Sequence, residues 1–206
     1  MDLQSGLGQT YAHIYIQTGD PVVLGRLNST INRVIELEPN NMATIYTVIQ
    51  FLENTGQIAK ANKLSDRALT IDSYNSILYE KSIQYKTDLA INEKSTHLAR
   101  EALNLYQRNV EQYEKMLEII DVSKLELYNS RNFEVTDQTK YLAALSSFIL
   151  GEYDQALNIL IEIEEDNEQL RRRVAALKTV VFMKKDDSRA KKFVEKYKND
   201  GEFHSI

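Results

Sequence analysis

The chain of 206 residues contains no cysteine and no tryptophan, and only two prolines and seven glycines. The lack of cysteine excludes disulfides, thiolate metal sites and cysteine nucleophiles. A β protein needs many turns and would normally contain more proline and glycine. The scarcity of both residues therefore predicts an all-α fold, in which long helices are joined by short connections.

Long hydrophobic runs are also absent. The apolar stretch from Leu142 to Leu150, among the longest, is far shorter than the roughly 20 residues that a membrane-spanning helix needs. The first residues, Met1 to Gly8, lack the basic start and the apolar run of a signal peptide. With 43% hydrophobic and 27% charged residues, the composition is typical of a folded, soluble protein.

The residue patterns that would support catalysis or a cofactor are missing. The three histidines, His13, His97 and His204, lie far apart and do not form the paired spacing of a metal site. Gly6-Leu7-Gly8 follows no strand pattern, so it predicts no phosphate-binding loop. Glu164 and Glu165 are adjacent, which directs their carboxylates to different faces of a helix. We expect no enzymatic activity, no metal and no cofactor.

The net charge of −5 is unevenly distributed. Leu170 to Asp200 contains 11 Lys or Arg and 4 Asp or Glu, a local balance of +7, so the remainder carries −12. A basic end around Arg171–Arg173 and Lys191-Lys192 could bind nucleic acid. Alternatively, it is a solvated terminal helix pair whose bases face the acidic run Glu162–Glu168. Aromatic residues for base stacking are nearly absent there, so we expect no nucleic-acid partner.

A pattern of about 34 residues repeats along the chain. It appears when Met42–Asn75 is placed above Ser76–Asn109, and again in the preceding unit, Gly8–Asn41. A later block begins at Asp137, and its next unit begins at Arg171. The residues that recur near the centre and on the second helix of the units are Leu27, Val34 and Ile35; Gly56, Ala61, Ala68 and Leu69; Ser95, Ala102 and Leu103; Gly151, Tyr153, Ala156 and Leu157; and Ala190.

This spacing has a physical reason. Two antiparallel helices approach closely only where their side chains are small, and Ala61, Ser95, Ala156 and Ala190 are predicted to provide that place near the start of each second helix. One hairpin cannot bury its apolar face alone, so neighbouring hairpins must stack.

Helix boundaries are marked by capping and turn residues. Asp20-Pro21 is predicted to begin the second helix of the first unit, with proline in the first turn. Asn41 can cap the helix that follows Pro39, and Thr136 or Asp137 can cap the helix of the later block. Asp72 to Asn75 provides turn chemistry between two units.

These residues resemble the tetratricopeptide repeat (TPR) family. Gly56, Ala61, Ala68, Gly151 and Ala156 match the glycine and alanine positions of its pattern, whereas the usual tryptophan is absent. The resemblance implies one domain over 1–206, a right-handed superhelix of antiparallel helix pairs with about eleven helices. Its predicted repeats are 8–41, 42–75, 76–109, 137–170 and 171–206.

The segment 110–136 is too short for a full repeat. Val110, Tyr113, Leu117 and Ile120 have helical spacing, which predicts a separate first helix from Val110 to about Val122. Ser123–Thr136 would then be a shortened return. The segment is either a functional irregularity or a degenerate repeat without function.

The TPR resemblance also implies a concave groove lined by the first helices of the hairpins. Its lining is mixed polar and aromatic, which suits an extended peptide or a helix of a partner protein. Chaperone-tail binders of the family hold a terminal carboxylate with Lys and Asn, but this chain has Tyr46 and Glu80 there, so we do not expect that ligand. The same residues could instead pack against the next hairpin. The predicted groove residues are Tyr46, Gln50, Asn54, Glu80, Gln84, Asp88, Tyr141, Leu145 and Phe148.

The expected function is a non-enzymatic scaffold or adaptor that binds a protein or peptide through this groove, or a second copy of itself. An alternative follows from Phe133–Leu157, which resembles the repeat domains attached to bacterial O-antigen ligases and polysaccharide polymerases. The chain would then be an accessory domain beside the envelope, with a membrane-associated partner. The expected compartment is the cytoplasm by default, or outside it under the alternative.

Overall fold

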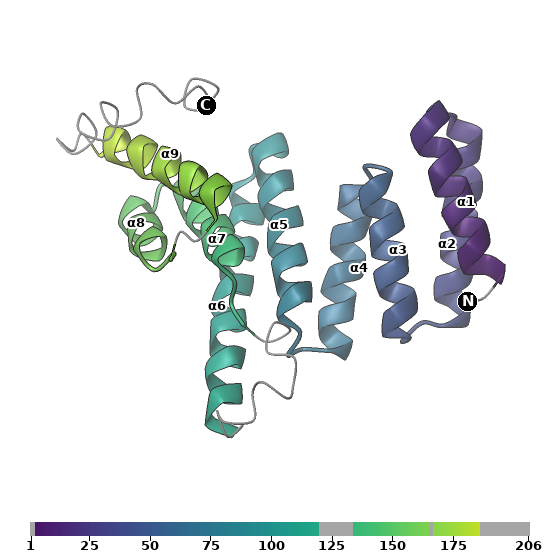
Figure 1. Ribbon diagram of the computed structural model, residues 1–206, viewed down its shortest axis with the longest axis horizontal. Coiled ribbons are helices and arrows are strands. Elements are labelled where there is room, and N and C mark those ends of the chain that lie inside the picture. Colours follow the sequence, from purple (N-terminus) through teal and green to yellow (C-terminus); the bar gives the residue numbers. More distant parts are fainter. Residues whose placement is uncertain (1–2, 120–133, 165–166, 186–206) are drawn as a thin grey trace. The chain divides into compact units, whose positions relative to one another are not determined.

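The computed structural model describes residues 3–119, 134–164 and 167–185. These residues contain nine helices and no strand, which confirms the all-α prediction and lies near the eleven helices expected (Figure 1). The helices are α1 (Leu3–Thr18), α2 (Pro21–Leu37), α3 (Met42–Asn54), α4 (Ile58–Ile71), α5 (Ser76–Glu93), α6 (Thr96–Ile119), α7 (Asp137–Ile149), α8 (Tyr153–Ile161) and α9 (Glu168–Lys184).

The chain forms two compact units, Met1–Lys81 and Ser82–Ile206. Helix α5 begins in the N-terminal unit and ends in the C-terminal unit. Each unit is described by itself below, and one domain over 1–206 stays a prediction.

The N-terminal unit contains two helical hairpins, α1–α2 and α3–α4, and α3 packs against both helices of the first hairpin. The predicted start of α2 is confirmed: the Asp20 carboxylate accepts a hydrogen bond of 2.8 Å from the Val22 amide, and Pro21 occupies the first turn. Asn41 caps α3 by accepting from the Thr44 amide at 3.2 Å.

The core of this unit lies around α3, whose apolar residues recur at helical spacing. Ile45 and Ile49 are fully buried, and Val48 and Leu52 are nearly so. On α4, Ala61 and Ala68 are both 0% exposed, as expected of residues at close helix contacts. The remaining buried residues of the unit are contributed mainly by α2, α4 and the start of α5.

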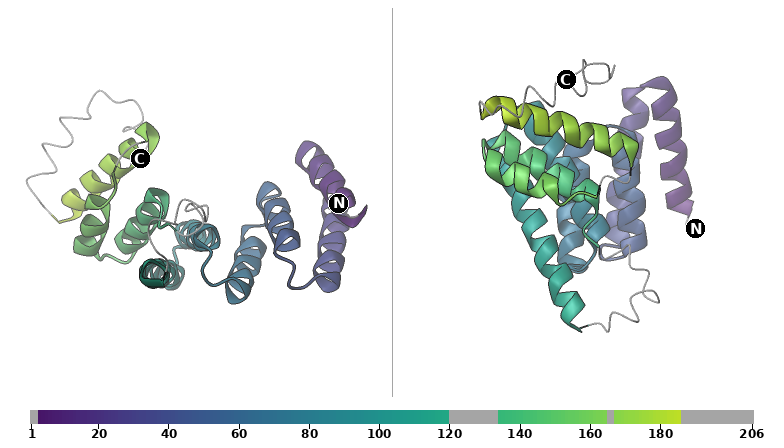
Figure 2. Two further views of the ribbon diagram at one scale, coloured as in Figure 1. Left: turned by 60° about the horizontal axis from the view of Figure 1, so that its bottom comes forward. Right: turned by 60° about the vertical axis from the view of Figure 1, so that its left-hand side comes forward.

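In the C-terminal unit, α7 packs against α6, α8 and α9 (Figure 2). Two polar contacts attach α5 to its neighbours within this unit. The hydroxyl oxygens of Thr87 and Ser146 lie 3.0 Å apart in the buried space between α5 and α7. Lys86, on α5, forms an ion pair of 3.1 Å with Glu101 on α6. As predicted, Thr136 caps α7, accepting from the Thr139 amide at 3.1 Å.

The turn between the two helices of a hairpin always contains one residue with a positive φ. Gly19, Gly56 and Gly151 have φ values of 64°, 71° and 77°, and Lys94 occupies the same place with 53°. The spacing between the first three of these turns along the chain, from Gly19 to Gly56 to Lys94, is therefore longer than the 34 residues predicted. The first interval contains α2, which has 17 residues, and the second contains α5, which has 18 residues whereas α3 has 13.

This register corrects the placement of Ser95. It was expected to correspond to Ala61 within the second helix, but it precedes α6 and its hydroxyl accepts from the Leu98 amide. Ala99, which is 0% exposed, takes the place of Ala61. No glycine marks the turn at Lys94, so the sequence alone did not reveal the longer first helix.

The expected helix from Val110 to Val122 is also corrected. Helix α6 continues without a break from Thr96 to Ile119, so Val110 lies inside it. Neither proline nor glycine occurs between these bounds, and Asn109 is buried within the helix. The segment Ser123–Thr136 lies largely outside the described residues, and so does Ala190.

Replacing Lys94 with glycine should stabilise the fold. A left-handed backbone conformation costs an L-residue roughly 1 kcal/mol, a cost that glycine does not have. We expect Lys94→Gly to raise the free energy of unfolding by about 0.5–1 kcal/mol. Urea denaturation measures the change. Lys94→Ala, which keeps the unfavourable conformation, is the control, and an equal gain in both variants would contradict the explanation.

Substitution by alanine should change the free energy of unfolding differently at two helical glycines. A Cβ atom at Gly25 would meet open space, so Gly25→Ala should add about 0.5–1 kcal/mol through helix propensity. A Cβ atom at Gly8 would lie 2.9 Å from Cε2 of Phe51, where α1 approaches α3. The Phe51 ring would have to shift, so we expect Gly8→Ala to give no gain or a loss. Thermal denaturation of both variants tests this, and an equal gain at Gly8 would show that the contact is not tight.

Candidate protein-binding surfaces

Three of the predicted groove residues form a row on α3. Tyr46, Gln50 and Asn54 follow one another every four residues, which places them on one side of the helix. Gln50 and Asn54 are exposed, whereas Tyr46 is half-buried. We call these three residues the α3 row. Val48 and Leu52, nearly buried, lie on the opposite side of the same helix.

The Tyr46 hydroxyl is held by its surroundings. Burial raises the pKa of Tyr46 above its ordinary value, and the nearby Asp72 raises it further, while a hydrogen bond with the Asn75 side chain lowers it. Asn75 is itself fixed, because its amide nitrogen donates to Asp72 at 2.9 Å. Tyr46 therefore offers a neutral, oriented hydroxyl group at physiological pH. Glu80, also in the N-terminal unit, is half-buried and has interactions with neighbouring groups.

The other predicted residues lie in the C-terminal unit, and one of them is covered. Tyr141 is only 8% exposed, and the Arg173 guanidinium lies over its ring, 4.4 Å from the ring centroid. Arg173 also donates to Gln138 at 3.4 Å. Gln84 is exposed. Leu145 and Phe148 are half-buried, and the Phe148 ring packs against Tyr153, with ring centroids 5.8 Å apart.

Arg173 on α9 covers Tyr141 on α7, and its positive charge also acts on Asp88 on α5. Burial raises the pKa of Asp88 above its ordinary value, and the positive charge of Arg173 partly offsets that rise. The sequence had suggested Arg173 only as part of a basic end. Its position, 32 residues after Tyr141 in the chain, gave no local signal for this contact. Tyr141 therefore takes part in a packing contact between α7 and α9 rather than in an open surface.

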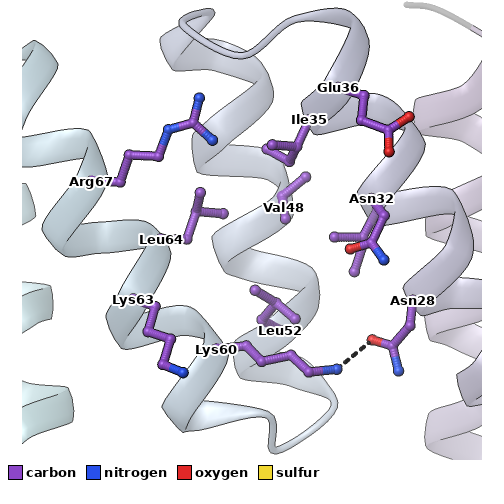
Figure 3. A pocket seen from close by; sticks show the side chains of 11 residues that line it. Asn28, Asn32, Ile35, Glu36, Val48, Leu52, Lys60, Lys63, Leu64 and Arg67 are labelled. Atoms are coloured by element: carbon purple, nitrogen blue, oxygen red, sulfur yellow. Dashed lines mark hydrogen bonds between the residues drawn. The ribbon is translucent and has the colours of Figure 1, made fainter.

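A cleft that the sequence did not predict lies between α2, α3 and α4 in the N-terminal unit (Figure 3). Its volume is about 560 Å³. Val48 and Leu52 form its floor, on the side of α3 opposite the α3 row (Figure 3). The cleft is lined by Asn28, Ile31, Asn32, Ile35, Glu36, Val48, Leu52, Lys60, Lys63, Leu64 and Arg67.

The edge of the cleft on α4 is basic. Lys60, Lys63 and Arg67 recur at intervals of three and four residues, which places them on one side of the helix. Lys60 donates to Asn28 across the cleft at 3.0 Å, and Arg67 donates to the Pro39 carbonyl at 2.7 Å. The basic row can be read from the sequence, but it does not by itself indicate a cleft.

Two kinds of feature are not found among the described residues. No group of three or more His, Asp or Glu side chains among them could hold a metal ion. None of their helices is both long and apolar enough to cross a membrane.

Burial raises the pKa of Tyr106 to about 12, and Glu162 adds to the rise, so this phenol stays protonated at neutral pH.

Comparison with known proteins identifies the type of fold. No family model matches the chain, and no curated protein matches it. A solved structure, the MamA RS-1 ArsTM double mutant, matches over 100% of this chain and 97% of its own, with 12% identity and a TM-score of 0.59. MamA contains tetratricopeptide repeats. The chain therefore has a TPR-like helical fold. These comparisons do not support the resemblance of Phe133–Leu157 to O-antigen ligase domains.

Replacing Asp88 with asparagine should stabilise the protein at neutral pH. The folded state holds the pKa of Asp88 above its ordinary value, so protonation favours folding, and this contribution is lost as the pH rises through the raised pKa. We expect Asp88→Asn to raise the melting temperature at neutral pH and to have little effect at a pH below the ordinary aspartate pKa. Thermal denaturation at both pH values measures the difference.

The control for this experiment is Glu111→Gln on α6, which removes one negative charge from an exposed position. A lower melting temperature of Asp88→Asn at neutral pH would show that the attraction of Arg173 outweighs the burial of the carboxylate.

Proposed function

We propose that the chain is a non-enzymatic scaffold that binds a segment of a partner protein on the α3 row. A TPR-like fold is typically a protein-interaction scaffold, which supports the class of function. The observation that carries the choice of surface is the exposure of Gln50 and Asn54 beside Tyr46, on a helix whose other side is buried.

The chemistry of the α3 row suits the backbone of an extended peptide. Gln50 and Asn54 carry amide groups that both donate and accept hydrogen bonds. Tyr46 adds an aromatic ring and a neutral hydroxyl whose orientation Asn75 maintains. None of the three is charged, so the row provides no cation for a terminal carboxylate. The proposed ligand is therefore an internal segment of a protein rather than its C-terminal end.

Two exposed substitutions on α3 test this surface. Gln50→Arg/Asn54→Arg adds bulk and charge where the peptide backbone would lie, without disturbing the core. We expect the variant to lose at least one specific partner that the unchanged protein captures from the lysate or the membrane fraction of the source cells. Quantitative mass spectrometry of the captured proteins measures the loss, and circular dichroism verifies that helicity is retained.

The matched control is Asn104→Arg/Gln107→Arg, which makes the same chemical change at two exposed positions of α6. This control should retain the partner. If both double variants capture the same proteins as the unchanged protein, the α3 row is not the recognition surface.

A further inference from the structure

The cleft between α2, α3 and α4 combines an apolar interior with one basic edge. Ile31, Val48 and Leu52 are buried at its base, while Ile35 and Leu64 are half-buried along its walls. Of the apolar side chains that line this open cleft of about 560 Å³, Ile35 and Leu64 remain partly in contact with water. Covering them with apolar groups of a ligand would be favourable.

The two edges of the cleft carry different charges. The α4 edge provides three cations, whereas the α2 edge provides two neutral amides, Asn28 and Asn32, and one carboxylate, Glu36. Glu36 is already paired with Arg33 at 3.4 Å. Lys63 is exposed, and no hydrogen bond or ion pair of its side chain is found among the described residues. The cleft therefore presents a net positive edge beside an apolar floor.

The arrangement of the cations determines the shape of ligand that fits. Lys60 and Arg67 lie at opposite ends of the cleft in Figure 3. They are seven positions apart on α4, which corresponds to a rise of about 10 Å. Three cations spread over this distance match several carboxylates in a row better than they match one small anion. Two turns of a helix have this length, and such a helix can present apolar residues at i, i+3, i+4 and i+7.

We propose that this cleft binds an amphipathic helix of a partner protein that carries acidic residues beside its apolar face. The apolar face of that helix packs against Ile35 and Leu64, above the nearly buried floor of the cleft. Its carboxylates lie along Lys60, Lys63 and Arg67. This site is separate from the α3 row, because it uses the opposite side of α3. It recognises charge as well as apolar shape, which the α3 row does not.

A peptide-display experiment tests the proposal without a known partner. The probe is a library of amphipathic helical peptides with leucines at i, i+3, i+4 and i+7 and random flanking residues, selected on the full chain. We expect the recovered peptides to be enriched in Asp and Glu on the flanks. A fluorescently labelled member should bind at least about fivefold more weakly to Lys63→Glu, because the reversal replaces attraction by repulsion.

Arg26→Glu is the matched control. It makes the same charge reversal at an exposed position of α2, outside the cleft lining. Binding to this variant should equal binding to the unchanged protein, and binding to Gln50→Arg/Asn54→Arg should also be unchanged. Loss of binding with the α3 variant alone would place the peptide on the α3 row and overturn the proposal for the cleft.

Three further results would overturn the proposal. One is the recovery of no peptides, or of peptides without acidic enrichment. A second is equal binding to Lys63→Glu and to the unchanged protein. The third is a concentration-dependent mass in light scattering that Lys63→Glu abolishes, which would make a second copy of the chain the occupant of the cleft.

Discussion

The close approach of paired helices at alanine is the constraint on which the rest of the structure depends. Ala61 and Ala68 in the N-terminal unit, and Ala99, Ala102 and Ala156 in the C-terminal unit, are all 0% exposed. A larger side chain at these places would separate the two helices of a hairpin and expose the apolar residues around them. The hairpin is thus the unit of folding, and stacking of hairpins completes each core.

The turn between paired helices follows from the same constraint. Two antiparallel helices that touch leave room for only a short connection, and each connection reverses through one residue with a positive φ. Glycine adopts this conformation readily, so Gly19, Gly56 and Gly151 mark three turns in the sequence. At Lys94 the pairing of α5 and α6 imposes the conformation on a residue that does not favour it. Tertiary packing, rather than local preference, determines that turn.

The difference between local preference and tertiary packing explains which parts of the fold could be predicted from the sequence. The helix class, the caps at Asp20, Asn41 and Thr136, and the buried alanines all depend on local chemistry that sequence spacing records. The length of α5 and the continuation of α6 beyond Val110 do not. Neither proline nor glycine occurs in α5 or in this part of α6 to mark where the helix ends. Helix α5, with 18 residues, is also longer than a repeat of about 34 residues predicts.

The candidate surfaces could likewise be predicted only in part from the sequence. The TPR resemblance implied that Tyr46 and Tyr141 face the groove from their first helices, but it could not show which later segments pack against those residues. Arg173 covers the Tyr141 ring, whereas Tyr46 remains half-buried. The cleft was missed for a related reason. Apolar residues at Ile35 and Leu64 have the spacing of a core, and only the structure shows that no described helix fills the space between α2 and α4.

Helix α3 belongs to both proposed surfaces, the α3 row and the cleft. Its 13 residues carry the α3 row on one side and the floor of the cleft on the other, with Ile45 and Ile49 fully buried between them. Fully buried side chains have little space to rearrange, so Ile45 and Ile49 transmit little movement from one side of the helix to the other. Two ligands on the opposite sides would therefore bind independently. A scaffold of this kind joins two partners by holding them on one rigid element, and it needs no conformational change to do so.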